Sequence, residues 1–154
     1  NHITSTYPEF IKFFGEVDSG QVLKLLRESH IFIHLSWIDS CPNSVIEAIG
    51  NNIPTICNNI GGTQEIVEAT NGGIVSKCDN FELVKPLFKD KKILDLNNPP
   101  IPDYKIIISD ILDLIENYQK FFLNINNSRI DIKNTTKEFY NFLNSILKKK
   151  ELIL

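Results

Sequence analysis

Methionine is absent from this 154-residue chain, and cysteine, histidine and tryptophan are scarce. The three cysteines, Cys41, Cys57 and Cys78, show neither a CxxC pair nor the spacing of a zinc site. An odd and sparse set excludes a disulfide-stapled scaffold and is typical of reduced thiols, so we expect a cytoplasmic protein without a bound metal. Cys57 lies in an apolar run and is expected to be part of the core.

Long apolar runs are absent as well. No segment approaches the roughly 20 apolar residues of a membrane span, and the first residues lack the pattern of a signal peptide. The only basic run is Lys148 to Lys150 and the net charge is -3, which excludes an electrostatic footprint for nucleic acid. We expect these lysines to complement a helix dipole. Contact with a membrane surface is not indicated, because stable anchoring normally needs two signals.

The composition that remains is that of a globular domain. Hydrophobic residues make up 42% of the chain and charged residues 23%, which suffices to bury a core within one domain. Because the chain begins at Asn1 rather than at a methionine, we expect it to be part of a longer protein.

Short apolar runs alternate with helical periodicity over residues 1–88. The nearly continuous apolar character of residues 30–35 is typical of a parallel strand covered on both faces. We expect Ser19 to cap the first helix. The alternation predicts an α/β fold, a Rossmann-like parallel sheet with helices on both faces. The strands are expected at residues 10–14, 30–35, 53–57 and 73–76, and later helices at residues 43–49, 63–69 and 81–88.

The character of the sequence changes after residue 88. A loop with several prolines is expected over residues 89–104, followed by apolar-periodic helices at 106–123 and 135–147. We therefore divide the chain into a Rossmann-like domain, residues 1–88, and a C-terminal part, residues 89–154. The helices of this second part are expected to pack on the sheet or on a further domain.

A polar segment between the second strand and its helix holds the candidate site. Asp39 and Glu47 lie at the carboxyl end of the expected sheet, and the N–H groups of Asn43, Ser44 and Val45 open a helix that could bind a diphosphate. A carboxylate at Glu47 could accept ribose hydroxyls. The alternative is that Asp39 caps the helix, Glu47 is a solvated acid, and solvent or the Ser40 hydroxyl satisfies the N–H groups.

Other residues near this edge are less specific. Gly61 and Gly62 follow the next strand and would line the same edge, although a glycine pair is more often only a turn. His30 and His34 have no acidic or nucleophilic partner at a suggestive spacing, so we expect them to pack structurally. Trp37 fits either a packing anchor or the edge of a pocket.

Together these segments resemble the C-terminal domain of family 4 glycosyltransferases, which have the GT-B fold. The resemblance covers roughly residues 10–80. Its most specific part is the acid pair, because a Glu-x7-Glu motif of the family reads here as Asp39-x7-Glu47. The residues that carry it are Phe14-Gly15-Glu16-Val17, the run His30 to Ser36, Pro42-Asn43 and Ala48 between and beside the acids, and Gly50, Pro54, Gly61-Gly62-Thr63 and Glu65.

The resemblance implies a role for each matching position. It implies that Glu47 binds the ribose of a UDP- or GDP-sugar and that Asp39, Asn43 and Ser44 hold the donor sugar and its diphosphate. The base would pack near Gly15 and Val17, and Gly61, Gly62 and Thr63 would form a phosphate loop. The implied reaction is a hexosyl transfer to an acceptor hydroxyl with retention, and it uses no cofactor.

Two features separate this chain from the family pattern. Asp39 is one methylene shorter than the usual glutamate. We also expect the basic Arg/Lys pair of the family, and the domain that binds the glycan, lipid or protein acceptor, to lie upstream of these residues. The isolated chain is therefore expected to be inactive. Two alternatives stay open: a nucleotide-sugar-binding module without transfer activity, and a nucleotide-sugar epimerase of related fold.

Overall fold

A three-stranded parallel sheet forms the centre of the computed structural model, which describes residues 7, 9–36, 39–78 and 101–151. The strands lie side by side in chain order, and each residue of β2 pairs with a residue of β3. Because all three run in the same direction, their carboxyl ends meet at one edge, the carboxyl edge. The strands are β1 (Phe32–His34), β2 (Thr55–Asn58) and β3 (Gly73–Ser76).

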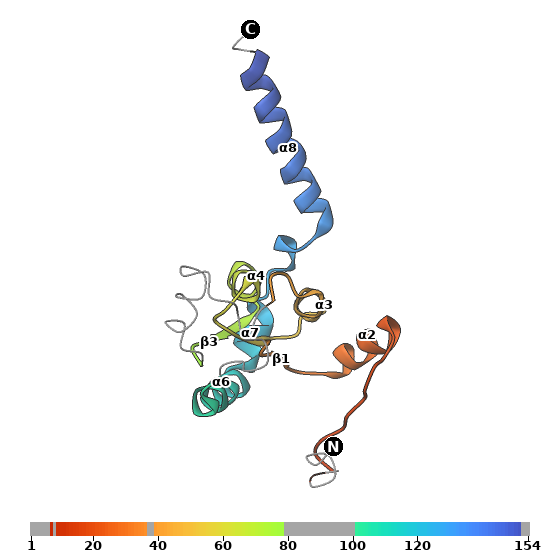
Figure 1. Ribbon diagram of the computed structural model, residues 1–154, viewed down its shortest axis with the longest axis vertical. Helices are drawn as coiled ribbons and strands as arrows, with labels where there is room; N and C mark the ends of the chain where they lie inside the picture. The colour runs from red at the N-terminus through yellow and green to blue at the C-terminus, as the bar shows by residue number, and fades with distance from the viewer. Residues whose placement is uncertain (1–6, 8, 37–38, 79–100, 152–154) are drawn as a thin grey trace, which may run out of the picture.

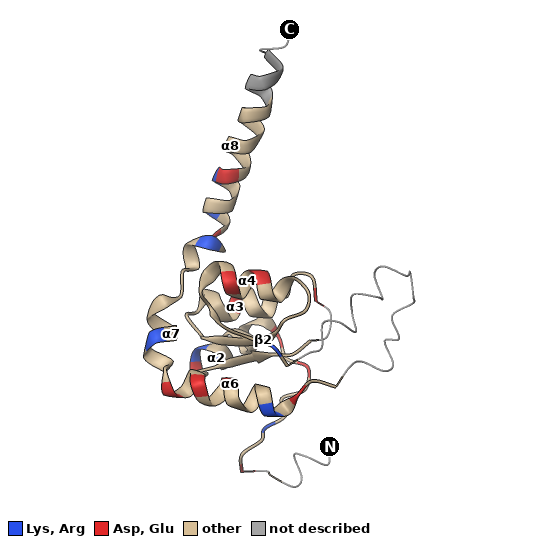
Figure 2. Ribbon diagram, turned by 90° about the vertical axis from the view of Figure 1, so that its left-hand side faces the viewer, with Lys and Arg blue, Asp and Glu red and all other residues tan. Residues whose placement is uncertain are grey.

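Helices cover both faces of this sheet. The crossover helices α3 (Asn43–Gly50) and α4 (Gly62–Thr70) lie on one side, and α6 (Tyr104–Glu116) lies on the other (Figure 2). The helices α3 and α4 contact β2, whereas α6 contacts β3. The predicted α/β, Rossmann-like architecture is thus confirmed.

The core lies between the sheet and its crossover helices. Val45 and Ile49 of α3 meet Cys57 of β2 and Val67 of α4, and all four are buried. Burying a side chain such as isoleucine or valine stabilises the fold by about 1.5–3 kcal/mol. The expectation that Cys57 belongs to the core is confirmed.

The N-terminal segment differs from its prediction. Residues 10–14 form no strand, and Phe10 and Phe13 are 81% and 71% exposed. A strand requires a neighbour to take its backbone hydrogen bonds, and none pairs with this segment among the described residues. The following helix, α2 (Ser19–Glu28), is capped by Asp18 instead of Ser19, because the Asp18 carboxylate accepts from the Gln21 N–H at 2.9 Å.

The remaining elements follow the predictions with shifted ends. The strand expected over residues 30–35 is confined to β1. Pro42, just before the helix expected over residues 43–49, adopts the extended dihedrals of an N-cap, φ -70° and ψ 114°. The predicted helix over 81–88 and most of the loop over 89–104 lie outside the described residues.

The helix predicted over residues 106–123 is broken. It is divided into α6 and α7 (Tyr118–Asn124) at Asn117, whose side-chain amide donates to the Asp113 backbone oxygen at 3.1 Å. A short 3-10 helix, η2 (Asn127–Arg129), follows, and the Asn126 N–H donates to Thr70 at 2.7 Å. This bond ties the C-terminal part to the end of α4.

The last helix, α8 (Ile132–Glu151), projects away from the body of the molecule (Figure 1). It contacts η2, and aromatic side chains such as Phe139 and Phe142 are about 60% exposed (61% and 59%). Of the C-terminal helices, α6 packs on the sheet as predicted, whereas α8 extends from it. Within the described part of the chain, no helix is long and apolar enough to cross a bilayer.

Candidate functional site

Two loops meet at the carboxyl edge of the sheet. The Gly62 N–H donates to the Asp39 backbone oxygen at 2.9 Å, and the Asn58 side-chain amide donates to the Ser36 backbone oxygen at 2.8 Å. The segment after β1 is thereby joined to the segment after β2. Asp39 and the glycine pair therefore line the same edge, as the strand order predicted.

The glycine pair is required by this close approach. Gly61 has a φ of +79°, and a Cβ there would lie 2.5 Å from the Asp39 backbone oxygen. A Cβ at Gly62 would overlap the Ser40 backbone oxygen. The Gly62 N–H already donates to Asp39, so it is not free to bind a phosphate. The main role of the glycine pair is therefore to position the loop of Asp39, and contact with a ligand comes second to it.

The two oxygens of the Asp39 side chain face different groups. Oδ1 accepts from the Cys41 N–H at 3.1 Å, while Oδ2 lies 3.7 Å from Nε2 of His34. Asp39 therefore does not cap α3, since Pro42 occupies that position and no side chain bonds to the first turn. The Asp39 side chain is 34% exposed, which leaves its carboxylate open to a ligand hydroxyl.

His34 lies in a strand, as expected, but it has an acidic neighbour that the sequence analysis missed. The expectation that it has no acidic partner is wrong, because the turn of the loop after β1 brings Asp39 back to it. Its ring stacks on Phe32 with centroids 6.2 Å apart, and its Nε2 atom is buried without a hydrogen bond among the described residues. Strand periodicity places His34 on one face of β1, but it does not give the path of the following loop. His30, by contrast, makes an edge contact with Tyr118.

The N-terminus of α3 is open. Among the described residues, the N–H groups of Asn43 and Ser44 donate no hydrogen bond, whereas that of Val45 donates to Pro42 at 3.1 Å. No acidic side chain lies in the first turn. Unpaired N–H groups at the positive end of a helix favour a bound anion.

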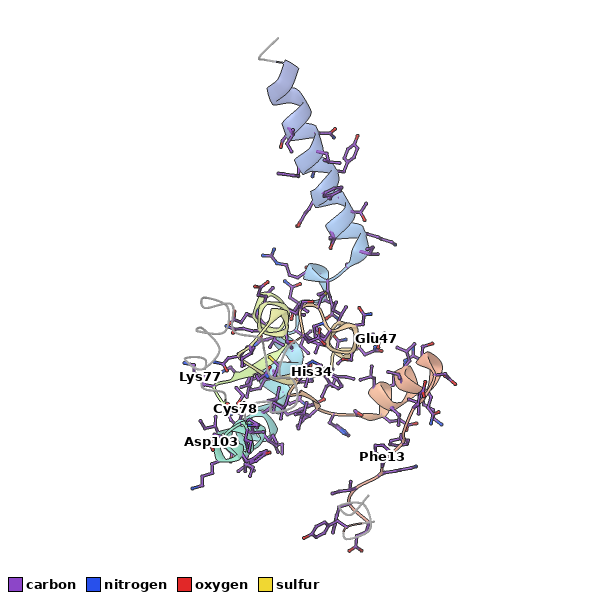
Figure 3. All side chains as sticks on the ribbon, viewed as in Figure 1. Phe13, His34, Glu47, Lys77, Cys78 and Asp103 are labelled. Atoms are coloured by element: carbon purple, nitrogen blue, oxygen red, sulfur yellow. The ribbon has the colours of Figure 1, made fainter. Side chains whose placement is uncertain are left out.

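Glu47 follows on the second turn of the same helix. Its side chain is exposed, and its carboxylate makes no hydrogen bond or ion pair within the described ranges. Figure 3 shows Glu47 on α3 and His34 on β1, two elements in contact, with Phe13 apart from both. One helix therefore carries two free N–H groups at its start and a free carboxylate on its next turn.

Unpaired buried polar atoms gather at this edge. Seven such atoms occur among the described residues, and five of them belong to residues at or just after the carboxyl ends of the strands. Asn58, which the sequence analysis missed, is one of these residues and pairs in register with Ser76. Buried polar groups normally have partners, so their concentration favours a place for polar ligands or water. The five atoms are His34 Nε2, Asn58 Oδ1, Asn59 Oδ1, Thr63 Oγ1 and Ser76 Oγ.

Comparison with known protein families shows which family this part of the chain matches. The family described as glycosyl transferases group 1 matches residues 6–89, more than half of the chain. The chain belongs to this family. No curated protein and no solved structure matches the chain. The matched residues contain the whole sheet and both loops of the carboxyl edge, so the family and the geometry point to the same part of this glycosyl transferase.

The structure does not bring every predicted residue of the glycosyl transferase to this edge. Gly15 and Val17 lie in the segment that leads to α2, which runs outside the body of the molecule in Figure 1. Gly15 has a φ of +67°, a backbone conformation that favours glycine. Trp37 lies outside the described residues, so its two interpretations both remain.

A cavity of about 430 Å³ lies elsewhere in the transferase. It is lined by Asn71 and Gly73, at the amino end of β3, and by Lys120, Phe121 and Asn124 of α7. The amino ends of parallel strands are opposite the edge where such folds bind ligands. This cavity is therefore separate from the candidate site.

Proposed function

We propose that the carboxyl edge binds a nucleotide-sugar donor, a UDP- or GDP-sugar, whose sugar the full protein transfers to an acceptor hydroxyl with retention. The observation that carries the proposal is the open start of α3. Two N–H groups and the free Glu47 carboxylate are presented by one helix, in the part of the chain that the glycosyl transferase family matches. A diphosphate needs N–H groups that donate hydrogen bonds to its oxygens, and a ribose needs a carboxylate that accepts hydrogen bonds from its hydroxyls.

Each group would contact a different part of the donor. Glu47 accepts hydrogen bonds from the ribose hydroxyls, while the N–H groups of Asn43 and Ser44 donate to the diphosphate and its sugar. Asp39 accepts from a hydroxyl of the transferred sugar. Its shorter side chain is held towards the loop by the Cys41 N–H, which restricts the hydroxyls that it can reach.

The base site, the phosphate loop and the acceptor site each depend on a further condition. The base site at Gly15 and Val17 requires the segment before α2 to lie against the sheet, away from its observed position. In the loop of Gly61, Gly62 and Thr63, a phosphate must bind without the Gly62 N–H, because this group already donates a hydrogen bond to the Asp39 backbone oxygen. The acceptor, a glycan, lipid or protein hydroxyl, would be bound by a further domain.

The role of Glu47 is tested by isothermal titration of UDP-glucose and GDP-mannose into the chain and its variants. We expect Glu47→Ala to weaken binding of the preferred donor by about 1.5–3 kcal/mol, because hydrogen bonds to a charged group are lost. Glu116→Ala, which removes an exposed acid at the end of α6, is the matched control and should leave affinity unchanged. Equal affinities of the wild type and Glu47→Ala would exclude Glu47 from the ribose site.

A further inference from the structure

His34 is the only histidine among the described residues that lies within 4 Å of an acid. Its Nε2 atom is buried and lies 3.7 Å from Oδ2 of Asp39, too far for a hydrogen bond but close enough to form one after a small rotation. The ring itself is restrained, because it stacks on Phe32 with an interplanar angle of 21°.

The geometry points to His34 as a positioning residue that fixes the carboxylate of Asp39 for the donor sugar, an inference that rests on the proposed function. The Cys41 N–H holds Oδ1, and an N–H on Nε2 of His34 would hold Oδ2. With one donor at each oxygen, the plane of the carboxylate is determined. The lone pairs that remain then face a ligand in one orientation.

Burial decides between positioning and direct contact. Nε2 is buried, whereas the Asp39 side chain is 34% exposed. A sugar hydroxyl can therefore reach Asp39 but not Nε2, and His34 acts on the ligand only through Asp39. An unprotonated Nε2 would turn its lone pair towards Oδ2 of Asp39, which is also an acceptor, so the neutral ring should carry its proton on Nε2, facing Oδ2.

The pair can be examined without any nucleotide. Long-range ¹H–¹⁵N spectra of the chain at pH about 8.5, above the ordinary titration range of histidine, report which ring nitrogen carries the proton. We expect the Nε2–H form for His34 in the wild type and a loss of that preference in Asp39→Ala. An Nδ1–H form in the wild type, or spectra that Asp39→Ala does not change, would show that His34 does not donate to Asp39.

The effect of His34 on donor affinity is measured by comparing ligands with and without a sugar. Titrations of UDP-glucose against UDP, and of GDP-mannose against GDP, separate sugar contacts from nucleotide contacts. We expect His34→Leu to weaken the preferred nucleotide sugar about tenfold, the size of one hydrogen bond to a charged group, and the diphosphate less than about twofold. His34→Gln, whose amide N–H lies near the position of Nε2, should restore most of the affinity.

A double-mutant cycle completes the test. In the Asp39→Ala background, His34→Leu should have no further effect on the nucleotide sugar, because the residue acts only through Asp39. Equal weakening of sugar and diphosphate ligands, or failure of His34→Gln to restore binding, would contradict the positioning role. If neither ligand binds the wild type while the spectra show the pair, the donor-binding proposal fails and the His34–Asp39 pair stands.

Discussion

Asp39 and Glu47 have different surroundings although both are acids at one edge of the sheet. Asp39 is held by the Cys41 N–H and faces His34, whereas the Glu47 carboxylate has no partner among the described residues. A held carboxylate can select one ligand orientation, and a free one can adapt to a pair of hydroxyls. This difference agrees with the proposed roles, Asp39 towards the sugar and Glu47 towards the ribose.

The glycine pair provides a test at the scale of single residues. We expect Gly62→Ala to lower the free energy of unfolding by at least about 2 kcal/mol, because its Cβ would overlap the Ser40 backbone oxygen. Gly50→Ala is the control, since a Cβ there would meet only Ile130, at 4.0 Å, and alanine favours a helix by up to about 1 kcal/mol. Urea denaturation measures both. Equal effects of the two substitutions would show that the loops do not approach this closely in solution.

The buried thiol of Cys57 makes stability depend on pH at the alkaline end. Burial, with repulsion from Glu68 and Cys78, raises the pKa of Cys57 from 9.0 to about 12. The folded state therefore keeps a proton that the unfolded state loses, so this contribution is complete below pH about 9 and is lost as the pH rises towards about 12. We expect the unfolding free energy of the wild type to fall over this window by up to about 1.4 kcal/mol per pH unit.

The comparison of variants isolates this thiol. Cys57→Ala should flatten the slope of unfolding free energy against pH above pH about 9, whatever its effect on absolute stability. Cys41→Ala, which removes an exposed thiol, should leave the slope as it is. A slope in Cys57→Ala as steep as in the wild type would assign the alkaline loss to other groups.

Single residues show how far sequence reasoning reaches. The meeting of Asp39 and the glycines at one edge could be predicted, because chain order determines which ends of parallel strands meet. The contact between His34 and Asp39 could not, since it depends on the path of a loop. The use of the Gly62 N–H by Asp39 likewise depends on a distance that no local pattern encodes.

At the scale of elements, the helix ends fall into two groups. The N-termini of α2 and α6 are capped by the side chains of Asp18 and Asp103. Those of α3 and α4, which follow strands at the carboxyl edge, have no side-chain cap, and neither does that of α7. Because an uncapped start leaves N–H groups available, α3 retains the donors that an anion requires, whereas in α4 the first of them, the Gly62 N–H, is used by Asp39.

Caps contribute to stability only where their helix packs. Asp103 caps α6, which packs on β3, and we expect Asp103→Ala to lower the unfolding free energy by about 0.5–2 kcal/mol. Asp131 accepts from the Lys133 N–H at 2.8 Å at the start of α8, whose side chains are largely exposed. Asp131→Ala should therefore leave cooperative unfolding, followed by tryptophan fluorescence, unchanged. An equal loss for both variants would mean that α8 is packed in solution.

The predicted elements failed where tertiary contacts decide. The apolar run of residues 10–14 favours a strand, but no neighbouring strand among the described residues pairs with it. The apolar period of residues 106–123 continues across Asn117, where α6 ends and the side chain of this C-cap residue bonds to Asp113. By contrast, β2 and β3, which pair with each other along their whole length, were predicted within two residues.

At the scale of the whole molecule, the sheet and the helices around it form one body, and α8 extends from it (Figure 1). The family match covers the sheet and the carboxyl edge but not α6, α7 or α8. The Asn126 bond to Thr70 joins the C-terminal part to the end of α4, the Asn127 bond to Asn52 joins it to the segment after α3, and α6 contacts β3. Because the segment of Asn126 and Asn127 meets the C-terminal ends of α3 and α4, we predict that donor binding at the opposite ends of these helices leaves α7 and α8 unchanged.

The central claim is that the carboxyl edge binds a nucleotide sugar, and amide chemical-shift mapping tests it most directly. ¹H–¹⁵N spectra of the chain would be recorded during titration with UDP-glucose and, separately, with GDP-mannose. We expect the largest shifts at the amides of Asn43, Ser44, Glu47 and Thr63, with those of α7 and α8 unaffected. Shifts that cluster around the cavity at Asn71 and Lys120, or no shifts with either donor at millimolar concentration, would contradict the account.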